Sequence, residues 1–343
     1  NQLTKKGTGN LTLSGGVGTN GTTGSMSLNV QEGTVTITGA QAKYLTNSTI
    51  NGNLVLSNGW MATRLATFGG TGQIQVAGTT SLWQNSSSAS YITNTVALLS
   101  GATLNLSNSV NLNLLGGLTG NGNVNVTAGS GDINISSSAF TGTITNNGTG
   151  GFRFLDVDIS GISLYSGTST SDFLFSNNVN RTVGGKISGS GAVSVRGSGL
   201  TTFTNTQNDF SGTININGSN TVSVAKFVGN SMGSGTTTNE IGLGKGNTLI
   251  LDGVTTVRNI GIKSGGGTIE VLADSSLGNM TNNTSGASTN GMMLTKTGAG
   301  NLTFTGLIRD GASADAPILN IAAGKITLSA SSGSSQYIGI NTN

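Results

Sequence analysis

The sequence of 343 residues contains no cysteine and no histidine, and it has a single proline. Without cysteine the chain forms no disulfide, offers no thiolate nucleophile and cannot build a Cys-ligated metal site. Without histidine there is no Ser-His-Asp or Cys-His arrangement and no His-ligated metal. These two absences exclude most hydrolytic mechanisms and most metal-dependent redox chemistry.

Charge and long apolar runs are also scarce. Charged residues make up 8% of the chain, aromatic residues 5%, and the formal net charge is +3. The 15 lysines and arginines are spread along the sequence and form no basic stripe, so we expect no nucleic-acid partner. No stretch approaches eighteen consecutive apolar residues, and we therefore expect no membrane insertion.

The residues that are abundant favour strands and turns. There are 57 glycines, and Gly, Ser, Thr and Asn dominate between steadily recurring Val, Ile and Leu. Glycine and asparagine are poor helix residues, whereas Thr, Val and Ile favour strands. The composition predicts an all-β protein of short strands separated by tight turns, with almost no helix.

One pattern, Gly-x-Gly-x-apolar-x-apolar, occurs repeatedly. Each copy predicts a turn followed by a strand with two apolar side chains inward and the alternate polar ones outward. Clear copies are GTGNLTL (7–13), GTGQIQV (70–76), GNGNVNV (120–126), GSGAVSV (189–195) and GAGNLTF (298–304). The predicted structural turn glycines are Gly7, Gly9, Gly70, Gly72, Gly120, Gly122, Gly189, Gly191, Gly298 and Gly300.

A longer similarity joins the two ends of the chain. Residues 3–15 read LTKKGTGNLTLSG and residues 294–306 read LTKTGAGNLTFTG. Strands that bury so few side chains must stack to share a core, and their irregular spacing favours a β-solenoid over a propeller. With roughly 20–25 residues per coil we expect about 15 coils and an elongated rod on the order of 70 Å. We assign residues 1–343 to one solenoid domain, clearest at 3–40 and 184–330 and irregular at 41–183.

The same phrases resemble the passenger-associated transport repeat of bacterial autotransporters. The segment ISGSGAVSVRGSGLTTFTNTQNDFSGTININGS (187–219) is similar to it as well. This resemblance implies a right-handed parallel β-helix exported to the bacterial surface, where it acts as an adhesin, a toxin scaffold or a structural stalk. The lack of cysteine agrees with a bacterial extracellular protein. The repeat specifies architecture and does not specify an activity.

Two acidic positions are candidates for chemistry. Asp156 and Asp158 lie two residues apart in FLDVDISG, and we expect them to share a strand face, a geometry within reach of acid/base work on a glycosidic bond. The alternative is a pair of solvated loop carboxylates. Asp132 in GSGDINI sits in a glycine-rich turn like those that bind calcium, but a single carboxylate is too few for such a site, so a structural turn is expected.

The aromatic residues Tyr44, Trp60, Trp83, Tyr91 and Tyr165 either form a surface on which sugars stack or pack beneath loops, and packing is the favoured interpretation. Irregular insertions often carry function, so the loops 17–25, 84–95, 205–211 and 279–291 are candidate binding segments.

Together these features predict a non-enzymatic, extracellular, structural or adhesive protein of the bacterial surface that needs no cofactor and no metal. Partners would be a surface glycan or protein of a host or cell. Because unpaired strand edges at solenoid ends invite another chain, head-to-tail self-association into a filament is a further expectation. The alternatives are a polysaccharide-degrading β-helix enzyme and a toxin-type passenger.

Overall fold

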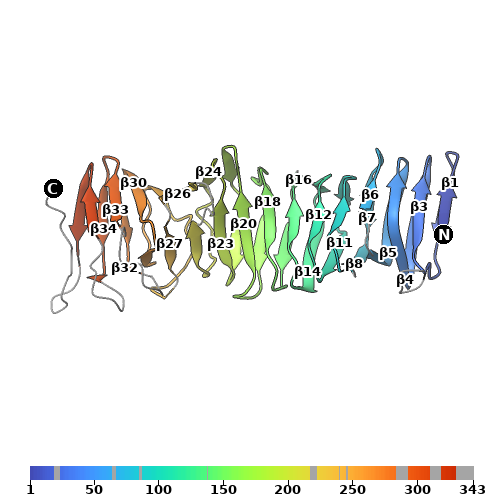
Figure 1. Cartoon of the computed structure of the whole chain (residues 1–343), viewed down its shortest axis with the longest axis horizontal. Coiled ribbons are helices and arrows are strands. Elements are labelled where there is room, and N and C mark those ends of the chain that lie inside the picture. The colour runs from blue at the N-terminus through green and yellow to red at the C-terminus, as the bar shows by residue number, and fades with distance from the viewer. Residues whose placement is uncertain are drawn as a thin grey trace. The chain divides into compact units, whose positions relative to one another are not determined.

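The computed structural model describes residues 1–18, 24–63, 67–84, 87–136, 138–216, 222–238, 240–244, 246–282, 293–309 and 318–329. The chain falls into two compact units, Asn1–Asp172 and Phe173–Asn343. Every regular element among the described residues is a β-strand, and the strands pair in parallel (Figure 1). The prediction of an all-β parallel β-solenoid is confirmed.

The N-terminal unit is built of three rows of parallel strands, and most coils contribute a strand, or part of a long strand, to each row. Its strands are β1 (Gln2–Lys5), β2 (Asn10–Leu13), β3 (Met26–Val30), β4 (Thr34–Ile50), β5 (Asn53–Thr63), β6 (Thr67–Gly69), β7 (Ile74–Ala77), β8 (Thr79–Gln84), β9 (Ser90–Ile92), β10 (Val96–Leu98), β11 (Thr103–Asn108), β12 (Leu112–Leu114), β13 (Leu118–Gly120), β14 (Asn123–Gly129), β15 (Ile133–Ile135), β16 (Ser138–Phe140), β17 (Thr143–Asn146), β18 (Phe152–Leu155) and β19 (Ser163–Ser166).

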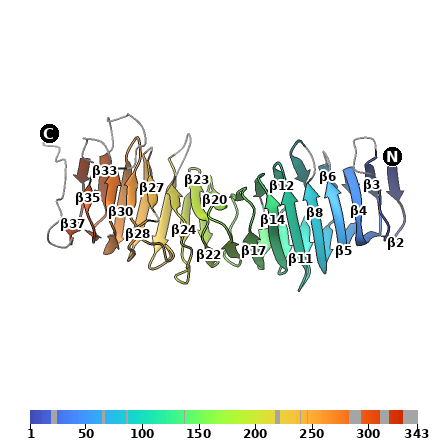
Figure 2. The same cartoon turned by 90° about the horizontal axis from the view of Figure 1, so that it is seen from below.

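The pairing pattern defines these rows. The first row runs β1, β3, the end of β4, β6, β9, β12, β15, β18. The second runs β2, the start of β4, the start of β5, β7, β10, β13, β16. The third runs the middle of β4, the end of β5, β8, β11, β14, β17, β19. Figure 2 shows β5, β8, β11, β14 and β17 following one another in this order. Leu54 pairs with Ile74 and Ile74 with Val96, so the coil length agrees with the expected 20–25 residues.

The C-terminal unit repeats the parallel pairing. Its strands are β20 (Asp172–Ser176), which begins at the boundary, β21 (Arg181–Val183), β22 (Ile187–Gly189), β23 (Ala192–Arg196), β24 (Leu200–Phe203), β25 (Ile214–Ile216), β26 (Val224–Val228), β27 (Ile241–Leu243), β28 (Asn247–Asp252), β29 (Ile260–Ile262), β30 (Gly267–Ala273), β31 (Ser275–Leu277), β32 (Met280–Asn282), β33 (Met293–Thr297), β34 (Asn301–Phe304), β35 (Ile308–Arg309), β36 (Ile318–Ile321) and β37 (Lys325–Leu328).

Alternation of apolar and polar residues produces the core of each unit. In the N-terminal unit the inward residues of one row stack from coil to coil, as Leu54, Ile74 and Val96 do, and all three are buried. In the C-terminal unit Phe203 and Phe227 are paired in register and their rings stack with centroids 4.5 Å apart. Each coil therefore gains its apolar burial from its neighbours, as expected of a solenoid.

The glycine pairs of the repeat turn the chain at the corners, and their two members have different roles. The first glycine has a positive φ at Gly7, Gly70, Gly120, Gly189 and Gly298. The second glycine, at Gly9, Gly72, Gly122, Gly191 and Gly300, is not among the residues with positive φ.

At the second glycine it is mostly close approach that leaves no room for a side chain. A Cβ at Gly72 would overlap the carbonyl oxygen of Gly52, and a Cβ at Gly52 would overlap that of Gly33. A Cβ at Gly33 would in turn overlap the carbonyl oxygen of Gly9, so these glycines form a column with one member in each successive coil. Gly9 itself has nothing within 4 Å of its Cβ position.

The near-identical phrases at the two ends fold in the same way. Lys5 donates from Nζ to the carbonyl oxygens of Lys6 and Gly7 in its own turn and of Glu32 in the next coil. Lys296 donates from Nζ to the corresponding carbonyls, those of Thr297 (2.8 Å), Gly298 (2.6 Å) and Ala323 (3.0 Å). The repeated Leu-Thr-Lys thus encodes a turn that is capped from the inside by a lysine.

Lys296 is fully buried, in register with the core residue Ile269, and burial lowers the pKa of its ammonium group. Lys43 is likewise buried, donates to the carbonyls of Thr38 (2.7 Å) and Gly39 (3.0 Å), and has a pKa lowered by burial.

Arg258 ties three coils of the C-terminal unit together. Its guanidinium group donates to the carbonyl oxygens of Phe210 (2.9 Å), Gly212 (2.6 Å) and Met232 (3.0 Å) and lies 4.9 Å from the centre of the Phe210 ring. Burial lowers the pKa of this guanidinium to about 10. Gly235 is required beside it, because a Cβ there would overlap the guanidinium group. The carbonyl of Phe210 also accepts from the amide of Ser234 (3.1 Å), whereas Arg258 supplies the donor for the carbonyls of Gly212 and Met232.

Candidate functional site

The outward side of the third row in the N-terminal unit carries four of the five aromatic candidates together with uncharged polar residues. One line of paired outward positions reads Trp60, Ser81, Asn105, Asn125, Thr145 and Tyr165. A parallel line two positions along the strands reads Ala62, Trp83 and Ser107. We call the surface formed by these two lines the aromatic face.

Three aromatic side chains gather at one end of the aromatic face. The indole rings of Trp60 and Trp83 are stacked, with centroids 5.6 Å apart and an angle of 13° between their planes. Tyr44 meets Trp60 edge-on at 6.3 Å. Ala62 is fully buried beneath this cluster even though its position faces outward, so the aromatic rings cover it. Both indoles remain partly exposed.

A groove of about 450 Å³ adjoins the two tryptophans. It is lined by Trp60, Ser81, Leu82, Trp83, Asn105, Ser107 and Thr127, none of which is charged. Asn125 donates from Nδ2 to Oδ1 of Asn105 (3.3 Å), and Thr127 donates from Oγ1 to the carbonyl of Leu106 (3.2 Å). An aromatic wall beside a floor of amide and hydroxyl groups can bind a ligand that has both an apolar face and polar edges.

The other two aromatic candidates lie apart from this cluster. Tyr165 is 46% exposed and stands at the far end of the line that begins at Trp60. Tyr91 is 43% exposed but belongs to β9 in the first row, where it is paired with Asn113. The five aromatic candidates therefore divide into a cluster of three, a distant member of the same face, and one residue on a different face.

The contact between the two tryptophans is predictable from their spacing in the sequence. Trp60 and Trp83 are 23 positions apart, which matches the coil length expected for this repeat and places them on neighbouring coils. Tyr44 precedes Trp60 by less than one coil, and its contact with Trp60 depends on the long strand β4, which has no glycine pair to mark it.

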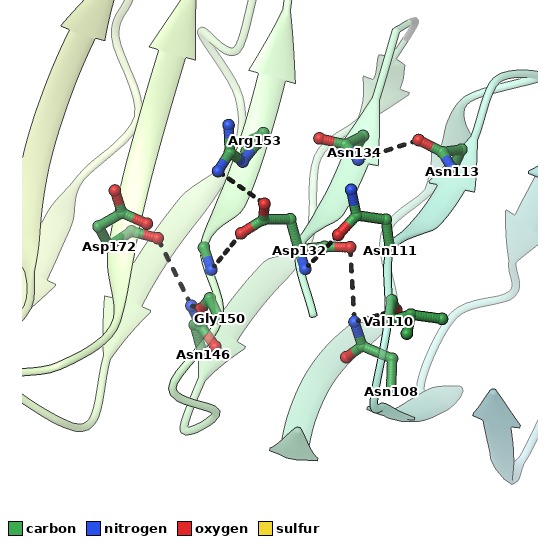
Figure 3. A network of polar contacts seen from close by, with 11 residues as sticks. Asn108, Val110, Asn111, Asn113, Asp132, Asn134, Asn146, Gly150, Arg153 and Asp172 are labelled. Atoms are coloured by element: carbon green, nitrogen blue, oxygen red, sulfur yellow. Dashed lines mark hydrogen bonds and ion pairs between the residues drawn. The ribbon is translucent and has the colours of Figure 1, made fainter. Parts of the chain in front are cut away.

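A second polar cluster, around Asp132, joins neighbouring coils of the N-terminal unit (Figure 3). Its carboxylate pairs with Nη2 of Arg153 (2.6 Å) and accepts a hydrogen bond from the amide of Gly151 (2.9 Å). The amide of Asp132 donates to Oδ1 of Asn111 (3.2 Å), and Asn134 donates to Asn113 (2.9 Å) in the same region. All of these contacts connect one coil to another, so Asp132 is a structural turn residue here.

The expectation that Asp156 and Asp158 share a strand face is wrong. Strand β18 ends at Leu155, and Asp156 follows it with φ of 56°, a left-handed conformation that stops the strand. Asp158 is exposed and accepts a hydrogen bond at Oδ1 from the amide of Ser160 (3.2 Å). Neither residue lines the groove beside the tryptophans.

The candidate loops are only partly described. Residues 19–23, 85–86 and 283–291 lie outside the described residues, so the interpretation of the loops 17–25, 84–95 and 279–291 as binding segments is untested over these positions. The loop 205–211 makes internal contacts: Asn208 accepts from the amide of Ile187 (2.8 Å), and Asn205 donates to the carbonyl of Gly184 (2.9 Å). Lys186 lies 2.7 Å from Asp209, and its hydrogen bond lowers the pKa of that carboxyl.

Within the described part of the chain, no group of three or more acidic side chains is placed to hold a metal ion. Among the same residues no helix is long and apolar enough to cross a membrane.

A scan against protein-family models, a search of curated proteins and a search of solved structures each find no match to this chain.

Proposed function

We propose that this chain is a non-enzymatic structural and adhesive protein of the bacterial cell surface, with a role like that of an autotransporter passenger. The observation that carries the proposal is the aromatic face, a regular outward surface of uncharged amide, hydroxyl and aromatic groups built on a stacked scaffold. Such a surface offers contact area without a reactive centre.

The acidic side chains discussed above support the same interpretation. Asp132 is engaged in an ion pair and a turn, and Asp158 accepts a hydrogen bond from its own loop. Lys226 pairs with Asp252 at 2.8 Å on the C-terminal unit. A glycosidase would need two carboxylates facing one bond across a cleft, and the groove beside the tryptophans is lined by none.

Two measurements test this function. Antibodies against the purified chain should label intact cells of the producing bacterium, and labelling only after permeabilisation would contradict a surface location. Beads coated with the chain should adhere to cell surfaces more than albumin-coated beads do. Release of reducing ends from polysaccharides incubated with the chain would instead indicate an enzyme.

A further inference from the structure

We propose that the aromatic face binds a neutral polysaccharide chain, with one pyranose ring stacked on the indole of Trp83 above Ser107. This inference rests on the proposed adhesive function and names its ligand class. It is carried by the register of the third row, by the uncharged lining of the groove, and by the position of Tyr165 along the same row.

The stacked indoles set the geometry. Trp60 and Trp83 lie on neighbouring strands as diagonal neighbours, because Trp60 is paired with Ser81 and Trp83 lies two positions further on, and their rings stack with centroids 5.6 Å apart. In the next coil the residue paired with Trp83 is Ser107, whose side chain is small. No aromatic ring follows Trp83 at this position, and the groove lies beside it. A ring-shaped ligand in the groove would stack on the indole of Trp83 as a third ring.

The polar groups around that position suit the hydroxyls of a sugar. Within the described part of the chain, the hydroxyls of Ser81 and Ser107 and the amide nitrogen of Asn105 have no hydrogen-bond partner. Asn105 Oδ1 already accepts from Asn125, which orients the amide so that its nitrogen points away from that contact. A saccharide presents an apolar ring face to an aromatic residue and hydroxyl groups at its edge. The groove offers both kinds of partner on neighbouring coils.

The lining also selects against charged ligands. None of its seven residues is ionisable at neutral pH, so an anionic polysaccharide would lose hydration without gaining a counter-charge. A protein partner would be expected to meet a larger apolar patch than two partly exposed indoles. Neutral glycans are therefore the class that fits best.

Tyr165 provides a second stacking position. It is aligned with Asn105 through Asn125 and Thr145, three strand steps away, which corresponds to about 14 Å. Its 46% exposure leaves the ring accessible. A glycan of several residues that stacks on Trp83 could reach Tyr165 along this polar line, whereas a disaccharide could not.

Intrinsic tryptophan fluorescence reports directly on this site. Its two tryptophans are Trp60 and Trp83, so all of its tryptophan fluorescence arises at the groove. Titration with soluble β-glucan, α-mannan and arabinoxylan, and with homogalacturonan as an anionic control, should give a saturable change in emission with at least one neutral polysaccharide. Oligosaccharides of five or more residues should bind more tightly than disaccharides.

Variants locate the binding. Trp83→Ala should weaken binding on the order of tenfold as measured by affinity electrophoresis, and Trp83→Phe should retain part of it because a ring remains. Tyr165→Ala should weaken binding of long chains only. Tyr91→Ala, which removes an equally exposed tyrosine from another row, is the matched control and should bind normally. Melting temperature and circular dichroism confirm that each variant is folded.

The results separate this inference from the adhesive function. No saturable binding to any neutral polysaccharide, preference for homogalacturonan, or unchanged binding by folded Trp83→Ala would overturn the proposed site. If coated beads adhere while no polysaccharide binds, the site fails and the adhesive function stands. If polysaccharide binds while beads do not adhere, the site stands and the adhesive function fails.

Discussion

At the scale of single residues, the structure assigns several polar side chains to the inside of the solenoid. Lys43, Lys296 and Arg258 are fully buried, and each donates to backbone carbonyl oxygens at a corner where the chain turns. A buried cation is costly unless its donors are satisfied, and here carbonyl groups satisfy them. Lys296 and Arg258 thereby connect neighbouring coils, whereas Lys43 caps a turn within its own coil.

The first prediction concerns Lys296. Replacing it with Met leaves three carbonyls without a donor and should lower the free energy of unfolding by about 2 kcal/mol at neutral pH. Because burial lowers the pKa of Lys296 below the ordinary 10.5, the unfolded chain binds more protons in the window just below that value. The stability contributed by this group therefore rises with pH there.

Urea unfolding of the wild type and the Lys296→Met variant across that alkaline window should show a stability difference that widens as pH rises. Lys325→Met removes an exposed lysine of the same unit and serves as the control, with little effect expected. Parallel curves for the wild type and the Lys296 variant would contradict the assignment.

The second prediction uses the two kinds of glycine. Gly72→Ala would drive a methyl group into the carbonyl of Gly52 and should destabilise the protein by about 3 kcal/mol. Gly9→Ala places its methyl group in open space at a residue without positive φ and should change stability by less than about 0.5 kcal/mol. Thermal melts of the two variants measure the contrast, and equal melting temperatures would count against the close approach.

At the scale of strands and coils, the alternation in the sequence predicted much of the packing. In GTGQIQV the inward positions are Ile74 and Val76, as expected, because a period of two residues is a local property. The solenoid could be predicted for the same reason, because each repeat of a turn and an alternating strand is visible within a few consecutive residues.

Other features of the coils depend on contacts more than twenty residues apart, and local pattern could not predict them. Lysine and arginine are normally exposed, so nothing near Arg258 in the sequence indicates that it lies buried against carbonyls of earlier coils. The prediction that Asp156 and Asp158 share a strand face was wrong for a related reason. It extended the alternating pattern of β18 beyond Leu155, whereas the left-handed conformation of Asp156 ends the strand there.

The third prediction tests how side chains join successive coils. Asp132 and Arg153 lie on neighbouring coils, and their side chains are 22% and 31% exposed. A double-mutant cycle with Asp132→Asn and Arg153→Met should give a coupling energy of about 0.5–1 kcal/mol, which shrinks in high salt. Unfolding in urea measures it, and a coupling of zero at low salt would mean that the pair makes no net contribution.

At the scale of the whole molecule, the scarcity of charge determines how the chain can interact. With 15 basic and 12 acidic residues in 343, long-range electrostatic attraction is weak, and recognition must rely on contact. The aromatic face fits this condition, because stacking and hydrogen bonding act only at short range.

The fourth prediction follows from this. Adhesion of coated beads and binding of neutral polysaccharide should change little between low ionic strength and about 1 M salt, where charges are screened beyond roughly 3 Å. A polycation of similar size should lose its adhesion over the same range and serves as the control. A steep loss of binding by this chain would point to an ionic partner and against the proposed surface.

The column formed by Gly9, Gly33, Gly52 and Gly72 restricts how such a gene can lengthen. Adding or removing one residue within a strand turns every inward side chain that follows in that strand outward, and a shift at the corner would bring a Cβ against a carbonyl oxygen at Gly33, Gly52 or Gly72. Copying a whole coil carries its glycine and its alternation along and leaves both intact. The coils of this column differ in length by a few residues and so absorb small changes, whereas lengthening by complete coils would preserve both features; the similar phrases beginning at Leu3 and Leu294 are what such copying would produce.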